Sequence, residues 1–225
     1  LTDNTKDLGN GLLKYKESTH ENDPVFMLTQ EISCIYSKGG KMRRNHIVIT
    51  APSLKVVGKI ADALGKIGNI ASDGRPILGM SSEDLAKKVL EISEECLIIP
   101  AHIWTPWFST FGSKSGYDSL EECFGEVTKY IYAFETGLSS DPEMNRRVKE
   151  LDNLALVSNG DAHSPPNLGR EATVFELEDL SYSNIYSAIK ESKMLGSDQN
   201  LKNKISYTIE FYPEEGKYHW DGHRD

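Results

Sequence analysis

The sequence contains little cysteine. Only three of its 225 residues are cysteines, Cys34, Cys96 and Cys123, and they lie far apart in the chain. No two of them have the spacing of a zinc-binding motif, so we expect neither a thiolate zinc site nor a disulfide framework. Isolated thiols of this kind are typical of a reducing compartment, and they favour a cytoplasmic protein.

Long hydrophobic runs are also missing. The longest apolar run is well short of the roughly 18 residues that a membrane-spanning helix needs, and the segment from Leu1 to Asp7 is too polar for a signal peptide. We therefore expect no membrane association. The chain also lacks an internal repeat, a low-complexity tract and a glycine-rich phosphate loop, and its length suits one sizeable α/β domain.

Positive charge is scarce. The 25 lysine and arginine residues are outnumbered by 34 acidic ones, and the net charge of −9 disfavours a broadly basic nucleic-acid surface. Carboxylates that bind metal ions contribute to this sum, however, and bound cations would reverse the local sign. A basic cluster between Lys38 and Arg44 is either a solvated hairpin tip or a contact for a phosphate backbone.

Carboxylates and imidazoles follow several short apolar segments, each of which we expect to be a strand. In α/β folds the ends of such strands meet at one edge, where metals and ligands bind. Asp161 and His163 are two apart on an extended segment, so they point the same way. Each expected strand is followed by a candidate ligand: 25–29 by Glu31, 96–101 by His102, 130–134 by Glu135, and 154–157 by Asp161 and His163. His46, by contrast, opens a strand at 46–51.

This residue set predicts a metal site. Imidazole and carboxylate groups together suit zinc, manganese or iron, whereas a set of oxygen ligands alone would suit magnesium or calcium. His102 is in an apolar setting where an unpaired imidazole would be costly, which favours a role as a ligand. Each residue also has a structural alternative. Asp161 and His163 could form an Asx-turn, and Glu31 could pair with Lys41 or Arg43.

Two residues stay less defined at this level. His46 is either a ligand or a residue that caps its strand. Glu135 is a ligand, a proton shuttle or a carboxylate that orients a ligand histidine, and the sequence does not separate these three roles.

Helical segments alternate with the expected strands. Apolar periodicity and capping residues predict helices at 53–67, 81–92, 141–151 and 183–191, and a late strand is expected at 205–212. Alternation of this kind predicts parallel pairing through right-handed crossovers. A barrel, complete or partly closed, best explains strand ends that converge.

An aromatic loop at 104–116 follows His102. Its exposed rings could stack on a base or sugar beside a metal site. They could equally fill a small hydrophobic core under the loop, and the sequence leaves both interpretations open.

With these residues identified, the chain resembles the PHP (polymerase and histidinol phosphatase) superfamily and, within it, the endonuclease Q family. The resemblance implies a distorted (β/α)7-type barrel that holds zinc or manganese, with magnesium as an alternative, through Glu31, His46, His102, Asp161 and His163. The matching motifs are Leu28-Thr-Gln-Glu31, Asp73-Gly-Arg-Pro76, Pro100-Ala-His-Ile-Trp-Thr-Pro-Trp107, Phe111-Gly-Ser-Lys-Ser-Gly116, Glu135-Thr-Gly-Leu-Ser-Ser-Asp141, Ser158-Asn-Gly-Asp-Ala-His-Ser-Pro165 and Leu168-Gly-Arg170.

The family cuts DNA on the 5′ side of deaminated bases and of abasic sites, so the resemblance implies damaged DNA as the partner. Glu135, Asp161 and His163 are the expected catalytic residues. Substrate contacts are expected from Arg75, Trp104, Trp107, Lys114 and Arg170, although structural pairing is the simpler role for Arg170, which is adjacent to Glu171. The alternatives are a phosphoesterase for a small substrate and a non-catalytic remnant of the fold that only binds.

The chain departs from the family at both ends. Superfamily members carry a His-x-His pair on their first strand, whereas His20 stands alone here, so we expect the barrel to be incomplete at the N-terminus. We expect a partial domain over 1–212, followed at 213–225 by the start of a linker to a zinc-binding region that this sequence does not include.

Overall fold

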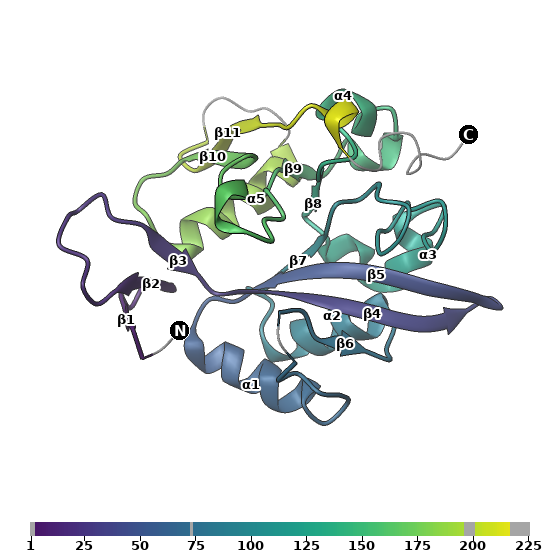
Figure 1. Ribbon diagram of the computed structural model, residues 1–225, viewed down its shortest axis with the longest axis horizontal. Coiled ribbons are helices and arrows are strands. Elements are labelled where there is room, and N and C mark those ends of the chain that lie inside the picture. Colours follow the sequence, from purple (N-terminus) through teal and green to yellow (C-terminus); the bar gives the residue numbers. More distant parts are fainter. Residues whose placement is uncertain (1–2, 73, 196–200, 217–225) are drawn as a thin grey trace.

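The computed structural model describes residues 3–72, 74–195 and 201–216 of the chain (Figure 1). Most of the expected linker at 213–225 lies outside the described residues, as does Asp73. The structure is a mixed α/β fold with four separate sheets. Among the described residues, no helix is long and apolar enough to cross a membrane.

The central sheet is built on one long hairpin. β4 (Thr29–Lys38) and β5 (Lys41–Thr50) pair antiparallel along their whole length. They are joined at Gly39 and Gly40, whose φ angles of 61° and 71° are the left-handed values that a two-residue hairpin turn requires. β6 (Ile77–Leu78) pairs parallel with β4, and β7 (Leu97–Pro100) pairs antiparallel with β5.

This pairing corrects two of our predictions. The strand expected at 25–29 is divided between β3 and the start of β4, and the strand expected at 46–51 is the second half of a longer one. Parallel pairing throughout is wrong for this sheet because two glycines allow the chain to turn back directly after β4. The basic cluster at Lys38–Arg44 therefore begins at a hairpin tip and runs into β5.

Helices α1 (Leu54–Leu64) and α2 (Ser82–Ile92) confirm two predicted segments. The Ser53 hydroxyl accepts a hydrogen bond from the Val56 backbone N–H, and Ser81 accepts one from Asp84, as N-cap residues do. Their apolar stripes pack on one face of the β4–β5 hairpin, together with α3 (Leu120–Phe124). The buried residues of this main core include Ile32, Ile47, Leu64, Leu85 and Phe124.

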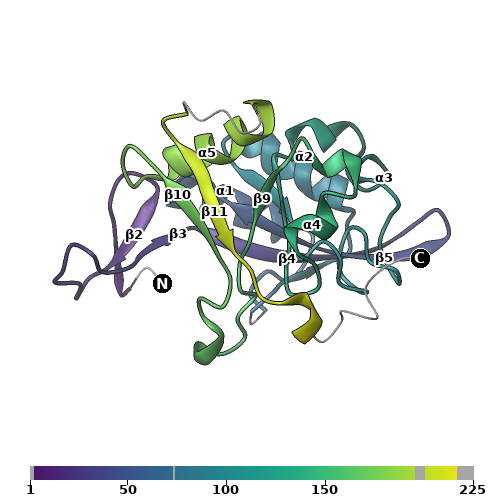
Figure 2. The same cartoon turned by 90° about the horizontal axis from the view of Figure 1, so that it is seen from above.

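A second layer lies on the other side of the central sheet (Figure 1). It contains the parallel pair β8 (Ala133–Glu135) and β9 (Ala155–Val157), the antiparallel pair β10 (Ala172–Glu176) and β11 (Lys204–Ile209), and helix α5 (Tyr182–Leu195). Figure 2 looks down on this layer and shows β10, β11 and α5 covering the strands beneath. The smaller core here joins Leu97, Ile99 and Val157 to Ile189 of α5.

The remaining elements are short. β1 (Thr5–Asp7), β2 (Leu12–Tyr15) and β3 (Val25–Met27) form an antiparallel sheet, and α4 (Pro142–Asn145) occupies the start of the helix expected at 141–151. The 3-10 turns are Gly125–Tyr130, Lys149–Leu151, Pro165–Asn167 and Pro213–Glu215. The α/β class is confirmed, but the strands of the described residues form no closed barrel.

Two glutamates lie where β10 begins and β11 ends. Glu171 precedes β10, Glu210 follows β11, and their neighbours Ala172 and Ile209 are paired in register. Glu171 is only 3% exposed, and one oxygen of each carboxyl is buried without a hydrogen-bond partner. Burial raises the pKa of Glu171 to about 7, and the charge of Glu210 adds to the effect.

The pair predicts a loss of stability at higher pH. Because folding raises the pKa of Glu171 from 4.5 to about 7, its contribution is complete below pH 4.5 and is lost as pH rises through 7. Glu171→Gln removes this dependence and supplies an amide donor toward Glu210. We expect its melting temperature to exceed that of wild type by on the order of 5 °C at pH 8, and by less at pH 5.

Thermal unfolding across this pH range measures the difference. Glu17→Gln, at an exposed glutamate, is the control and should follow wild type at every pH. A Glu171→Gln curve parallel to wild type would show that this carboxyl does not titrate in the range.

Candidate metal centre

Three predicted ligands converge at one point of the inner face of the central sheet. His46 Nδ1 lies 2.9 Å from Glu31 Oε1 and 3.0 Å from His102 Nε2, and the distance from His102 Nε2 to Glu31 Oε1 is 3.6 Å. Both histidines are buried, and the Glu31 side chain is 22% exposed. One carboxylate oxygen and two imidazole nitrogens at this separation could hold a metal ion.

The hairpin register explains how two of the ligands meet. Ser33 is opposite His46 and Glu31 is opposite Val48, so Glu31 and His46 lie on the same face of the sheet, diagonal to each other. Alternate residues face the main core instead, which is why Ile32 and Ile47 are buried against the helices. Our placement of these ligands at strand ends is therefore wrong, since both lie within long antiparallel strands.

His102 does follow a strand, as predicted. β7 runs antiparallel to β5, and the Ala101 backbone N–H donates to the His46 carbonyl. The chain therefore delivers His102 directly beside His46. Their rings meet edge to face with centroids 5.1 Å apart, and Phe108 stacks on the other side of His46 at 4.5 Å.

The local electrostatics favour the metal-binding forms of Glu31 and His46, but they shift His102 toward its protonated form. Burial raises the pKa of Glu31, but hydrogen bonds from His102 and His46 outweigh it and hold that pKa well below its usual range. Burial also lowers the pKa of His46 to about 4, so that its imidazole is neutral at physiological pH. The pKa of His102 is raised because contacts with Glu31 and Glu135 outweigh its burial.

The outer nitrogen of His102 has a defined partner. Its Nδ1 lies 3.0 Å from the Thr105 hydroxyl, which is also 2.8 Å from the Trp107 carbonyl. In the neutral form of His102, a Thr105 hydroxyl that donates to that carbonyl accepts from Nδ1–H, and the Nε2 lone pair then faces Glu31 and His46 in place of an N–H. This tautomer is the one that a metal ligand needs, so the residues present fit a bound divalent cation.

Glu135 holds the backbone of His102. Its Oε2 accepts from the His102 N–H at 2.8 Å, and its Oε1 accepts from the Asn159 side-chain amide at 2.8 Å. Glu135 is 4% exposed. His102 has a φ of 29°, a left-handed value that is unfavourable for a residue with a Cβ. The buried Glu135 carboxylate therefore holds the strained backbone of His102, and Asn159 holds that carboxylate.

Gly137 makes room for the same histidine. A Cβ at this position would lie 2.4 Å from the Cβ of His102, a distance that no side chain tolerates. Gly137 also has a φ of 66°, which glycine adopts at little cost. The segment that supplies Glu135 thus supplies the space for His102 two residues later.

Asp161 and His163 do not join the cluster of three ligands. Asp161 lines the adjoining cavity and has a φ of 40°, and its carboxylate contributes to the raised pKa of His102. His163 is 73% exposed and its Nδ1 lies 2.9 Å from the Asp161 carbonyl. The Arg170 guanidinium donates to the carbonyls of Gly160 and Asp161, so it holds this loop.

The other expected contact residues differ in their surroundings. Arg75 donates to Glu31 at 3.0 Å and is its basic partner, in place of Lys41 or Arg43. Trp104 packs on buried Phe111 and its indole N–H donates to Asn145. Trp104 thus packs against the main hydrophobic core. Trp107, by contrast, is 45% exposed, and Lys114 is exposed.

A cavity of about 630 Å³ opens beside the ligands. Glu31, His102, Glu135, Asn159 and Asp161 line its polar end. The rest of its wall is mostly apolar and is formed by residues such as Phe26, Val48, Leu97, Val157, Phe175 and Ile185. A largely apolar cavity with a few polar groups is typical of a ligand site.

Several residues of the centre had no assigned role in the sequence. Thr105, Gly137 and Asn159 all fall inside motifs quoted for the resemblance, so the signal for them was present, but their roles depend on contacts across the fold. The sequence gives no indication that Phe108 contacts the centre, beyond its place in the aromatic loop.

We expect Gly137→Ala to displace His102 and lower metal affinity by a factor of ten or more, because the new methyl group overlaps the histidine Cβ. Gly169→Ala is the matched control: its φ is 76° with no atom within 4 Å of the added Cβ, so it carries only the backbone cost of about 1–2 kcal/mol. Titration of manganese or zinc against a chelator compares the two. Equal affinities would show that the close approach to His102 does not matter.

Substitution of Glu135 tests whether it positions His102 or binds the metal. We expect Glu135→Ala to weaken metal binding by roughly 10–100-fold, as for other partners of ligand residues, and Glu135→Gln to restore part of this because an amide oxygen still accepts from the His102 N–H. Asn159→Ala should give a smaller loss. If Glu135→Gln is as damaging as Glu135→Ala, Glu135 acts as a ligand instead.

Comparison with known proteins gives two curated relatives of unknown function. YqxK of Bacillus subtilis is 31% identical over 175 residues, which are 77% of this chain and 42% of YqxK. MJ0043 of Methanocaldococcus jannaschii is 32% identical over 123 residues, 52% of this chain and 14% of that protein. This chain therefore spans less than half the length of either relative. No family model matches the sequence.

A solved structure matches almost the whole chain. The lesion-specific endonuclease PfuEndoQ from Pyrococcus furiosus superposes with a TM-score of 0.78 and 30% sequence identity, over 96% of this chain and 48% of that protein. The match confirms the resemblance inferred from the motifs. The protein has an endonuclease Q-like fold.

Proposed function

We propose that this chain is part of a metal-dependent endonuclease that cuts the DNA backbone 5′ to deaminated bases or abasic sites. The observation that carries the proposal is the convergence of Glu31, His46 and His102 beside a cavity, in a chain that superposes on a lesion-specific endonuclease. DNA repair is the corresponding process. Because the chain spans 48% of that neighbour, the activity is proposed for the whole protein of which it forms a part.

The ligand set favours zinc or manganese, with magnesium as the alternative. A divalent cation held by these side chains would supply a lowered pKa for a bound water and would neutralise charge on the scissile phosphate. Glu31 and the two histidines would bind it, and Glu135 with Asn159 would keep His102 in place. We also assign Asp161 to the reacting region, since its carboxylate lines the cavity near His102.

Substrate contacts fall into two groups. Trp107 and Lys114 are accessible and could meet a base and a phosphate. Arg75 and Arg170 are already engaged by Glu31 and by backbone carbonyls, so a direct role would require them to exchange partners. His163 is exposed next to Asp161, where it could reach a second ion or the leaving group when DNA is bound.

A cytoplasmic location fits the three cysteines. Cys34, Cys96 and Cys123 are all buried as free thiols, which is the form expected in a reducing compartment.

Cleavage assays test the function directly. The full-length protein should be incubated with manganese or zinc and with oligonucleotides that contain uracil, hypoxanthine or an abasic site, beside undamaged DNA and a phosphate monoester. We expect metal-dependent cleavage 5′ to the lesion. His102→Ala and Glu31→Gln should lower it at least 100-fold, because each removes a ligand, whereas His20→Ala, at an exposed histidine, should not.

The alternatives give different results. Hydrolysis of the monoester alone would indicate a small-molecule phosphoesterase. Protein that binds no metal, even after manganese or zinc is added, and that cuts no substrate would indicate a domain that only binds.

A further inference from the structure

Two adjacent arginines on β5 have opposite surroundings. Arg43 and Arg44 are consecutive in a strand, so their side chains leave opposite faces of the sheet. Arg43 lies over the Tyr117 ring at 4.1 Å and donates to the Gly116 carbonyl. Its positive charge is thus used to hold the end of the aromatic loop in place.

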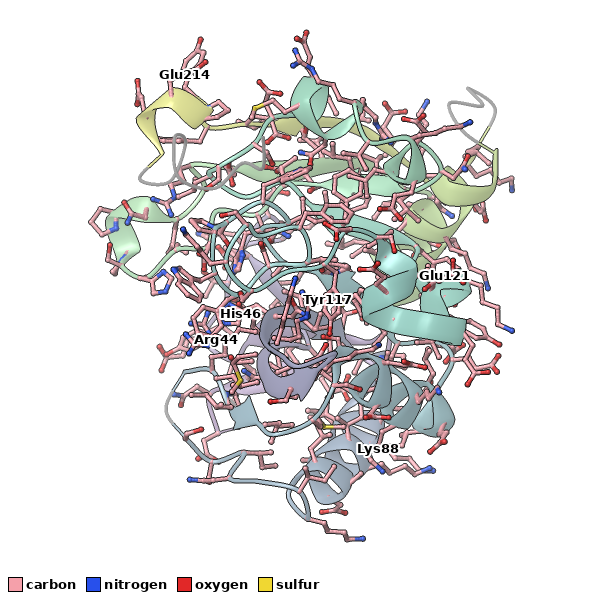
Figure 3. All side chains as sticks on the ribbon, turned by 90° about the vertical axis from the view of Figure 1, so that its right-hand side faces the viewer. Arg44, His46, Lys88, Tyr117, Glu121 and Glu214 are labelled. Carbon is pink, nitrogen blue, oxygen red and sulfur yellow. The ribbon has the colours of Figure 1, made fainter. Side chains whose placement is uncertain are left out.

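Arg44 lies on the same face as the metal ligands. It is two residues before His46, and both side chains contact Phe108: the His46 ring is stacked at 4.5 Å, and the Arg44 guanidinium lies 5.7 Å from the ring centroid. Figure 3 shows Arg44 next to His46. The guanidinium therefore lies near the candidate metal centre and contacts the same aromatic ring as His46.

The Arg44 guanidinium has no anionic partner. Within the described part of the chain, it forms no ion pair and donates no hydrogen bond, and its Nε is buried without an acceptor. Arg75, by contrast, is neutralised by Glu31. A half-buried charge without an acceptor is unfavourable, and such groups often complete their hydrogen bonds with a ligand.

Aromatic contacts fix the orientation of this charge without neutralising it. The guanidinium lies 5.1 Å from the Trp107 ring centroid, and Trp107 is itself 45% exposed. Stacking on a ring leaves the N–H groups at the edge of the guanidinium free to donate, and their fork matches two phosphate oxygens. Phe108, which contacts both Arg44 and His46, has a φ of 63°, a strained value for a residue with a Cβ.

We propose that Arg44 binds a backbone phosphate of the DNA substrate beside the metal centre, with Trp107 as its stacking support. The inference rests on the proposed function and adds a specific contact to it. In a chain of net charge −9, an unpaired guanidinium next to the reacting groups is the feature that would attract and orient the phosphodiester chain.

The test compares three charge-removing variants. Arg44→Gln removes the proposed contact, Arg43→Gln removes the adjacent arginine that stacks on Tyr117, and Lys88→Gln removes a positive charge from α2 on the helix-covered side of the sheet. DNA affinity is measured against salt concentration with a lesion-containing duplex. We expect Arg44→Gln alone to reduce the slope of log K against log salt by about one, and to raise KM more than it lowers kcat.

The controls separate a contact from a folding effect. Arg43→Gln should lower the melting temperature and leave the salt slope unchanged, and Lys88→Gln should change neither. Arg44→Lys keeps the charge and loses the fork, so it should keep the slope and bind with reduced affinity.

The outcomes distinguish this inference from the proposed function. If wild type binds and cuts the duplex but Arg44→Gln has the wild-type slope and KM, the Arg44 contact is overturned and the nuclease assignment stands. If wild type binds DNA with a slope that depends on Arg44 and yet cuts nothing, the contact stands and the activity is wrong. If wild type does not bind DNA at low salt, both are overturned.

Discussion

The centre depends on one hydrogen bond, from the backbone N–H of His102 to the buried carboxylate of Glu135. His102 has a backbone conformation that is unfavourable for its residue type. The strained conformation is retained because Glu135 accepts a hydrogen bond from the His102 N–H and Asn159 holds Glu135 in place. Gly137 leaves space for the Cβ of His102. These contacts join the end of β7 to the ends of β8 and β9, so the centre forms only when the two layers pack together.

Strain is concentrated at this point of the fold. The positive φ angles recorded for non-glycine residues in the described part of the chain are those of His102, Phe108 and Asp161. All three surround the candidate centre: His102 is one of the three residues that could hold a metal ion, Phe108 stacks on another of them, His46, and Asp161 lines the cavity. Such conformations cost of order 1–3 kcal/mol each, and a fold retains them together where they position side chains for a shared task.

The sequence predicted the chemistry of the centre better than its geometry. Glu31 and His102 are expected as ligands because each follows an apolar strand, whereas His46 is expected as a ligand only through the family resemblance. Their actual meeting depends on the register of β4 against β5, which places Glu31 and His46 on one face. The register is set by the turn at Gly39 and Gly40 and by long-range packing. A prediction of strands that alternate with helices does not include this hairpin turn. Local signals were enough for α1 and α2, whose caps are within three residues of the groups they bind.

Arg43 and Arg44 show why neighbouring identical residues cannot be distinguished from sequence alone. Both belong to the basic cluster that was equally consistent with a solvated tip and a phosphate contact. Alternation along β5 sends Arg43 toward Tyr117, where the Gly116 carbonyl accepts from it. It sends Arg44 toward Trp107, where its guanidinium has no acceptor among the described residues. Arg43 is therefore neither solvated nor free to bind phosphate, whereas the side chain of Arg44 is on the face that carries His46. The two arginines differ because successive residues of a strand point to opposite faces of the sheet. The consequence for each arginine can be stated only once the residues that pack on each face are known.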